Sequence, residues 1–220
     1  MPQQKPKNFS PRQFQEALGI SDTLLQRFVL YGEKLEKWQR KINLVSPATL
    51  PDLWHRHFLD SAQLDSLISK NSKTLLDIGS GAGFPGLVLA LLRSAGGGPT
   101  VHLVEANQRK ATFLAEVNRE TEAGAVIHKR RIESIHELKA DVITARACAP
   151  MTKLLPMISP ILKQDGCCLL LKGENAQEEL TESQKKWKMK VEKIPSQTND
   201  SGVILNISDL SPKNDSRSKP

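Results

Sequence analysis

Cysteine is scarce in this chain, and its few positions exclude several classes of protein. The three cysteines are Cys148, Cys167 and Cys168. They form neither a disulfide framework nor the spacing of metal ligands, so no metal site is expected. Cys167 and Cys168 lie in an apolar run, which is typical of core packing. So few thiols suit a reducing compartment, and we predict a cytoplasmic protein.

Long hydrophobic runs are missing as well. The longest apolar segments are far too short to cross a bilayer, so no membrane partner is expected. The first residues are polar and rich in Gln, Lys and Pro, unlike a signal peptide. Residues 1–9 are predicted to form a flexible tail, and the polar residues 211–220 are predicted to be disordered.

Positive charge, by contrast, is in excess. The chain has 31 Lys and Arg against 24 Asp and Glu, a formal net charge of +7 and an isoelectric point near 9.4. This balance indicates an anionic partner, either nucleic acid or an acidic surface. Solubility alone is the other explanation.

The size of the chain allows one core with a small appendage. It has 220 residues, of which 39% are hydrophobic. Residues 10–70 are predicted to form an N-terminal helical appendage. Ser10 and Pro11 start a first helix, Asp22 is expected to cap a second, and a third is expected over residues 50–64. Apolar residues recur every three or four positions in the second helix, on one face: Leu24, Phe28, Tyr31, Leu35, Trp38 and Ile42.

Strands and helices alternate from residue 71 to residue 210, which is typical of a mainly parallel sheet. The predicted strands are 74–78, 101–105, 125–128, 141–145, 166–171, 191–194 and 203–207. Helices are predicted after the second, fourth and fifth of these strands, over residues 108–121, 153–162 and 174–187. A short loop joins the last two strands, which favours an antiparallel hairpin at the sheet edge. We therefore predict an α/β, Rossmann-like domain of the kind that SAM-dependent methyltransferases use.

A glycine-rich turn follows the first predicted strand, in the sequence TLLDIGSGAGFPG. Gly79, Gly81 and Gly83 allow positive φ angles and a close approach of backbone to ligand. The spacing D-x-G-x-G-x-G, with Asp77 first, resembles the first motif of Rossmann-like methyltransferases. The turn also satisfies the weak dinucleotide pattern G-x-G-x-x-G. A carboxylate at Asp77 would repel a diphosphate and suits S-adenosylmethionine (SAM), which carries an ammonium group.

Further candidates stand where the other parallel strands end, since ligands bind at that edge of open α/β sheets. Glu105 is placed to accept hydrogen bonds from ribose hydroxyls, or alternatively to cap the next helix. Arg146 follows an apolar strand and would stand beside the cofactor, because a buried guanidinium needs partners. Lys172 has a similar but weaker placement. Five residues after the third strand complete the set: Ile132 and Glu133 near the adenine end, with Lys129, Arg130 and Arg131 facing RNA phosphate or solvent.

The string WHRHFLDSAQL in the helical part invites a hydrolase or zinc interpretation. His57 and Ser61 are one helical turn apart, as are Arg56 and Asp60. A hydrolase triad is disfavoured because no strained nucleophile turn precedes the serine. Packing of the appendage onto the sheet is the favoured role, with substrate contact second.

Together these segments resemble the glucose-inhibited division protein B family of small-subunit ribosomal RNA guanine-N7 methyltransferases. The similar strings are LLDIGSGAGFPG, HRHFLDS, NLV at Asn43–Val45, RIE at 131–133, Arg146-Ala147 and Leu171-Lys172-Gly173. The resemblance covers residues 20 to 208. It implies methylation of the guanosine at nucleotide 527 of 16S rRNA. It also implies SAM contacts at Gly79, Phe84, Ile132, Glu133 and Arg146.

Guanine N7 carries a lone pair in the ring plane and loses no proton on methylation, so this reaction needs no general base. Alignment of N7, methyl carbon and sulfonium sulfur is what the protein must supply, and orientation is worth about 7–11 kcal/mol. Arg146 is expected to orient acceptor or cofactor, and we expect a monomer.

Three alternative functions fit the same sequence features. The first is a SAM-dependent methyltransferase acting on another RNA, a small molecule or a protein. The second is an NAD-dependent oxidoreductase, and the third is a non-catalytic RNA-binding protein.

Overall fold

The structure, a computed structural model, describes residues 9–94 and 96–213. The predictions for residues 1–8 and 214–220 lie outside the described residues. Within that part of the chain one sheet has the order β3-β2-β1-β4-β5-β7-β6. The strands are β1 Thr74–Ile78, β2 Thr100–Val104, β3 Val126–His128, β4 Ala140–Arg146, β5 Leu162–Lys172, β6 Trp187–Pro195 and β7 Val203–Pro212. Strands β1 to β5 are parallel, and β7 is antiparallel to both β5 and β6. The predicted fold class is confirmed.

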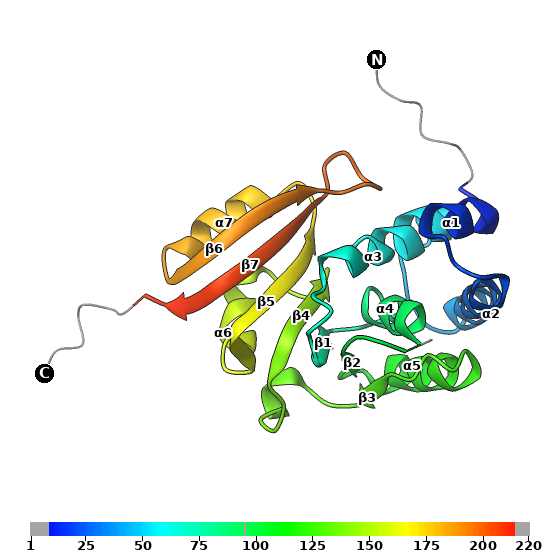
Figure 1. The fold of residues 1–220 in the computed structure, drawn as a ribbon, viewed down its shortest axis with the longest axis horizontal. Coiled ribbons are helices and arrows are strands. Elements are labelled where there is room, and N and C mark those ends of the chain that lie inside the picture. The colour runs from blue at the N-terminus through cyan, green and yellow to red at the C-terminus, as the bar shows by residue number, and fades with distance from the viewer. Residues whose placement is uncertain (1–8, 95, 214–220) are drawn as a thin grey trace, which may run out of the picture.

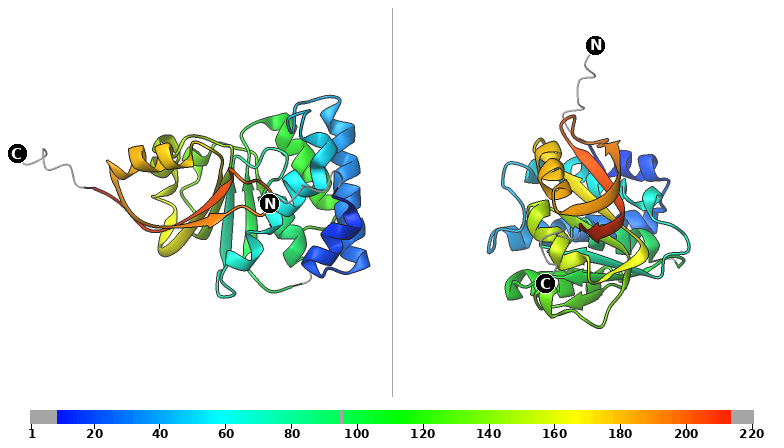
Figure 2. Two further views of the ribbon diagram at one scale, coloured as in Figure 1. Left: turned by 90° about the horizontal axis from the view of Figure 1, so that it is seen from above. Right: turned by 90° about the vertical axis from the view of Figure 1, so that its left-hand side faces the viewer.

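Helices cover both faces of this sheet (Figures 1 and 2). They are α1 Pro11–Leu18, α2 Asp22–Gln39, α3 Asp60–Ala62, α4 Gly86–Arg93, α5 Gln108–Glu120, α6 Met151–Ile158 and α7 Ala176–Gln184. Shorter turns are the 3-10 segments Leu50–Asp52, Asp65–Leu67 and Ile132–Ser134, and the π-helix Trp54–Leu59.

Two hydrophobic cores follow from the alternation of side chains along the strands. Leu75 of β1 faces the larger core, which contains α1, α2, α4 and α5, whereas Leu76 and Ile78 face the smaller core under α6 and α7. The helical appendage therefore shares one core with the α4 side of the sheet.

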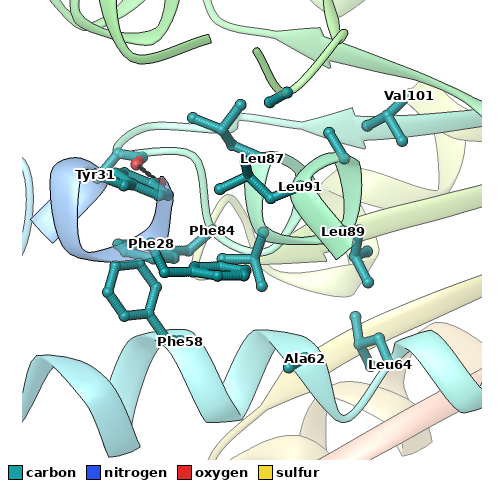
Figure 3. Packing of buried hydrophobic residues seen from close by; sticks show 14 of the residues in the cluster. Phe28, Tyr31, Phe58, Ala62, Leu64, Phe84, Leu87, Leu89, Leu91 and Val101 are labelled. Carbon is teal, nitrogen blue, oxygen red and sulfur yellow. Dashed lines mark hydrogen bonds between the residues drawn. The ribbon is translucent and has the colours of Figure 1, made fainter. Parts of the chain in front are cut away.

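Aromatic rings join the appendage to the glycine turn (Figure 3). Phe28 and Tyr31 of α2 and Phe58 of the π-helix are fully buried, and Phe84 of the turn is 3% exposed. The ring of Phe58 contacts all three of the others, with centroids 5.1 to 5.7 Å away. This packing fixes the turn against the helices that precede it in sequence.

Several predicted boundaries in the appendage were wrong. The hydroxyl of Ser21, not Asp22, caps α2 by accepting from the Leu24 amide at 3.2 Å. The single helix expected over 50–64 is instead a 3-10 turn, the π-helix and the short α3. Phe9, expected in a tail, packs its ring 5.4 Å from that of His55.

The elements near the C-terminus also differ from the prediction. Helix α6 ends at Ile158, two residues before Pro160, and α7 ends at Gln184 because Trp187 already starts a strand. Strand β7 continues through Ser211 and Pro212, which were expected to be disordered. The long β6–β7 hairpin forms because Trp187, Met189 and Val191 alternate with lysines, so that one face packs on the smaller core.

Candidate functional site

A cavity of about 760 Å³ opens at the carboxyl ends of the parallel strands. This volume lies within the usual range for small-molecule sites. Most of its walls come from four parts of the chain: residues 44–60, the glycine turn, the ends of β4 and β5, and the β6–β7 loop. Lys110 of α5 and Glu179 of α7 complete them. The lining includes Gly79, Gly81, Phe84, Arg146 and Lys172 among the predicted residues.

The glycine turn forms the floor of the cavity. Gly79 and Gly81 have φ values of 65° and 56°, a region that favours glycine, and both line the cavity. Gly83 lies beneath: a Cβ there would collide with the hydroxyl of Tyr31, which donates a hydrogen bond to the carbonyl of Ala82. Tyr31 thus holds the turn from the appendage side.

Glu105 lies behind this floor and is joined to it by a hydrogen bond. Its carboxylate accepts from the Gly81 amide at 2.8 Å and from the Asn107 amide at 2.7 Å. The cap of α5 is Asn107, whose side chain accepts from two amides of the first turn, so Glu105 is not the helix cap. Glu105 therefore places negative charge on the turn and keeps lone pairs for further donors.

Asp77 is not among the residues that line the cavity. It is fully buried, and the hydroxyl of Thr144 donates to its Oδ1 at 2.7 Å, which ties β1 to β4. Burial raises the pKa of Asp77 to about 6, against the opposing effect of the Thr144 hydrogen bond. Direct contact between Asp77 and a cofactor stays a prediction.

Arg146 is held on several sides at the end of β4. One guanidinium nitrogen donates to Asp60 Oδ2 and to the Arg56 carbonyl, each at 3.2 Å, and the other donates to His57 Nδ1 at 2.8 Å. The guanidinium carbon lies 4.8 Å from the centre of the Phe84 ring. Burial lowers the pKa of Arg146, and Asp60 opposes that effect.

The tautomer of His57 follows from these partners. An arginine only donates, so Nδ1 of His57 accepts and Nε2 carries the proton. Nε2 lies 2.9 Å from the Thr49 hydroxyl, which in turn donates to the Ser46 carbonyl at 2.9 Å. Burial and the neighbouring Arg146 lower the pKa of His57 to about 3, which keeps the ring neutral.

Asp60 connects Arg146 to the β6–β7 hairpin. While Oδ2 accepts from Arg146, Oδ1 accepts from Thr198 at 2.6 Å and from Gln63 at 3.0 Å. The π-helix supplies Arg56 and His57, and Asp60 follows directly after it. Such π-helical turns are frequent at functional sites.

Lys172 is bound to its own carboxylate. Its ammonium donates to Glu179 at 2.8 Å and to the Ala149 carbonyl at 3.1 Å, and Glu179 also accepts from the Met151 amide at 2.8 Å. Cys148, beside Gly79 in the cavity wall, has a pKa raised by burial.

The residues predicted after β3 lie outside the cavity lining. Ile132 is buried in the smaller core, and Glu133 is exposed. Lys129 and Arg131 are exposed, while Arg130 forms an ion pair with Glu137. A cofactor role for Ile132 and Glu133 and an RNA role for the basic run stay predictions.

Sequence reasoning missed the partners of Arg146 and the β6–β7 loop. The string around His57 was singled out, but no sequence signal connected it to Arg146, 89 residues away. The position of the loop could have been predicted from the sequence. Because β7 is antiparallel to both β5 and β6, β6 has the direction of the parallel strands, and its end lies at the edge where those strands end. Ser196, Thr198 and Asn199 consequently line the cavity.

These residues fit SAM better than a dinucleotide. The Gly81 amide, which a diphosphate would need, is taken by the Glu105 carboxylate, and the negative charge there opposes an anionic ligand. The free lone pairs of Glu105 suit ribose hydroxyls. Backbone of Gly79 and Gly81 would lie against the cofactor.

Solved structures show the same architecture. The chain is similar to a ribosomal protein L11 methylase from Lactobacillus delbrueckii subsp. bulgaricus, with a TM-score of 0.55, 17% identity and coverage of 68% of this chain and 76% of that one. It is also similar to the magnesium protoporphyrin IX methyltransferase of Synechocystis with bound SAM, with a TM-score of 0.54, 12% identity and coverage of 86% and 97%. The fold and the glycine turn are those of the Rossmann-like class to which these two methyltransferases belong.

Comparison of sequences narrows this class to one family. Residues 24–203 match the GidB family, described as rRNA small subunit methyltransferase G. The proteins of that name from Paramagnetospirillum magneticum and Rhodospirillum centenum are 48% and 46% identical, over 91% and 94% of this chain and 96% and 94% of their own lengths. The chain belongs to this family, and its cofactor is SAM, so the oxidoreductase alternative is set aside.

Two further features concern the described part of the chain as a whole. None of the helices found there is both long enough and apolar enough to span a membrane. Across residues 9–94 and 96–213, no group of three or more His, Cys, Asp or Glu side chains is arranged to hold a metal ion.

Proposed function

We propose that this chain transfers the methyl group of SAM to N7 of a guanosine in 16S rRNA, at nucleotide 527. The family match supports methylation of small-subunit rRNA. The position and the acceptor atom rest on the resemblance of the sequence motifs and on the chemistry of the cavity.

The choice of guanine N7 as the acceptor atom is supported by the hydrogen bonds of the side chains in the cavity that could act as a general base. Among the described residues, each candidate base there already has a partner. His57 accepts from Arg146, Asp60 accepts from Arg146 and Thr198, and Glu179 accepts from Lys172. A site without a free base suits an acceptor that loses no proton, and guanine N7 is such an atom because its lone pair lies in the ring plane.

When bound, SAM supplies an electrophilic methyl group on a sulfonium. The protein has to align the acceptor with that group and exclude water. Such orientation of the reactants accelerates the reaction. Arg146 is suited to orient one of the two reactants because its planar guanidinium carries five N–H donors and is fixed by hydrogen bonds to Asp60, His57 and the Arg56 carbonyl. Phe84 supports the guanidinium from below, since its ring is stacked between Tyr31 and His57.

The target base must leave its stack to reach this cavity. A base inside a helix is inaccessible to a buried methyl donor, so the guanosine has to be unpaired and turned outward. Residues of the 44–49 segment and of the β6–β7 loop line the cavity and would flank the entering nucleotide.

The direct test is transfer of labelled methyl groups from SAM to 16S rRNA from cells that lack this gene. Mass spectrometry of nuclease fragments then locates the label. The proposal expects 7-methylguanosine at nucleotide 527 and no label in free guanosine or 23S rRNA. Label on another atom, another nucleotide or another RNA would contradict it.

A further inference from the structure

A second hollow, of about 450 Å³, lies beside the methyl-transfer cavity. It is formed by the end of α2 with the segment that follows, and by the start of α5. Four of its lining residues are cations: Arg40, Lys41, Arg109 and Lys110. The remaining lining residues are Gln39, Ile42, Asn43 and Asn107, so no carboxylate lines it.

These four cations differ from their neighbours along the same pair of helices. Farther along the interface of α2 and α5, Lys34 pairs with Glu116 at 2.9 Å and Glu120 at 2.6 Å. Arg27 of α2 likewise pairs with Glu122 at 2.7 Å, just beyond α5. At the hollow, in contrast, two basic residues that follow α2 and two at the start of α5 line the same space, and none of the four has an ion pair with any described carboxylate.

This arrangement costs stability that the rest of the interface avoids. Like charges repel, and positive charge in the first turn of α5 opposes the helix dipole. The first turn of α5 holds no acidic residue to compensate. A bound polyanion would relieve both effects, since its charge would lie between the cations.

The hollow is continuous with the cavity in which methyl transfer is proposed. Lys110 lines both, and Leu44 to Ser46, which follow Asn43 of the hollow, line the cavity. A strand of RNA whose base enters the cavity would therefore carry its neighbouring phosphates over these four side chains.

We infer that this basic hollow binds the phosphate backbone of the RNA that flanks the target guanosine. The inference rests on the proposed function, and it replaces the run Lys129–Arg131 as the main phosphate contact. That run lies after β3, outside both hollows, and Arg130 is already paired with Glu137.

The test is the salt dependence of binding to unmodified 16S rRNA, compared between the full-length chain and a Lys41→Gln, Arg109→Gln double variant. Each phosphate contact contributes about 0.7 to 0.9 to the slope of log affinity against log salt, so the slope should fall by about 1.4 to 1.8. The KM for RNA should rise, whereas the affinity for SAM by calorimetry and kcat at saturating RNA should stay unchanged.

Two matched double variants remove the same charge elsewhere. Lys186 and Lys188 are exposed and lie around the start of β6, which is far from α2 and α5 in Figure 1 and in the left view of Figure 2. Their exchange for Gln should leave the slope unchanged, and Lys129→Gln with Arg131→Gln should lower it less than the hollow variant does. An unchanged slope in the hollow variant, or an equal fall in either control, would overturn the inference.

Failure of this inference is separate from failure of the proposed function. If the unaltered chain methylates 16S rRNA while the hollow variant binds RNA with the original slope, only the hollow assignment is wrong. If the unaltered chain places no methyl group on 16S rRNA, the proposed function is wrong whatever the slope shows.

Discussion

Two groups of positive charge stand at the same edge of this sheet, and they are built in opposite ways. Arg146 has its guanidinium bound by a carboxylate, a carbonyl and a neutral histidine, and its side chain is only 18% exposed. The four cations of the basic hollow have no carboxylate partner among the described residues. A caged cation is suited to one fixed geometry near the reacting atoms, whereas unpaired surface cations suit a mobile polyanion.

The largest effect should come from removing the caged cation. Arg146→Ala should lower kcat about 10²- to 10³-fold, the range for loss of one positioned donor at a reacting centre. Methyl transfer to 16S rRNA at saturating RNA measures it. Arg146→Lys keeps the charge and loses the planar fork, so it should recover little of the rate. Near-normal turnover of the alanine variant would remove Arg146 from the catalytic centre.

The concentration of salt should affect the cations of the basic hollow and Arg146 differently in the unaltered chain. Four phosphate contacts give a slope of about 3, so raising salt from about 50 to 200 mM should raise the KM for RNA about fifty-fold. The kcat should hardly change, because a buried ion pair is screened much less than exposed charges. Steady-state kinetics across this range provide both values. A kcat that falls in step with the rise in KM would contradict the distinction.

The cage itself can be weakened at Asp60. Asp60→Asn removes the charge that faces Arg146 and leaves a group able to accept from Thr198, so kcat should fall about tenfold through misplacement of Arg146. The KM for RNA and the affinity for SAM should change little. As a control, Asp65→Asn removes a carboxylate that pairs with Arg93 at 2.7 Å, away from the cavity lining. Equal loss of kcat in both variants would show a general effect on folding.

A smaller effect concerns the neutral histidine of the cage. The pKa of His57 is lowered to about 3 in the folded chain, so the unfolded chain binds the proton first as pH falls below about 6.5. The stability from neutral His57 is present above that pH and is lost toward pH 3, at about 1.4 kcal/mol per pH unit.

His57→Gln keeps an acceptor for Arg146 and a donor for Thr49 but cannot take up this proton. Its free energy of unfolding should therefore fall less between pH 6.5 and pH 4 than that of the unaltered chain, as urea titrations at each pH measure. Asp77, whose raised pKa of about 6 acts in the opposite direction, is present in both chains and cancels in the difference. Parallel pH curves would show that His57 is not held neutral.

The fold could be predicted largely from the sequence because its signals are local. The limits of β1 match the prediction at both ends, since an apolar run is bounded by Lys73 and the glycine turn. Errors arose where two local signals compete. Trp187 was assigned to a helix, although the alternation of Trp187, Met189 and Val191 has the period of a strand.

The site was only partly predictable for a different reason. Residues at the end of a strand or just after it, such as Arg146 and Gly79, are placed by topology, and both line the cavity. The cage of Arg146 depends on side chains of the π-helix, whose irregular turn has no sequence signature. That Arg40 and Lys41 have no ion pair with a described carboxylate can likewise be seen only once α5 is packed beside α2. In the sequence, a continuous basic run such as 129–131 was the more prominent feature.

The most direct test of positioning by Arg146 and RNA binding by the hollow is the single-turnover rate of methyl transfer at saturating 16S rRNA. It is measured for Arg146→Ala and for the Lys41→Gln, Arg109→Gln variant. The caged cation should remain indispensable, with a rate still reduced about a hundredfold or more, while the hollow variant regains the full rate once RNA is in excess. Recovery of Arg146→Ala by added RNA, or persistent slowness of the hollow variant, would contradict this account.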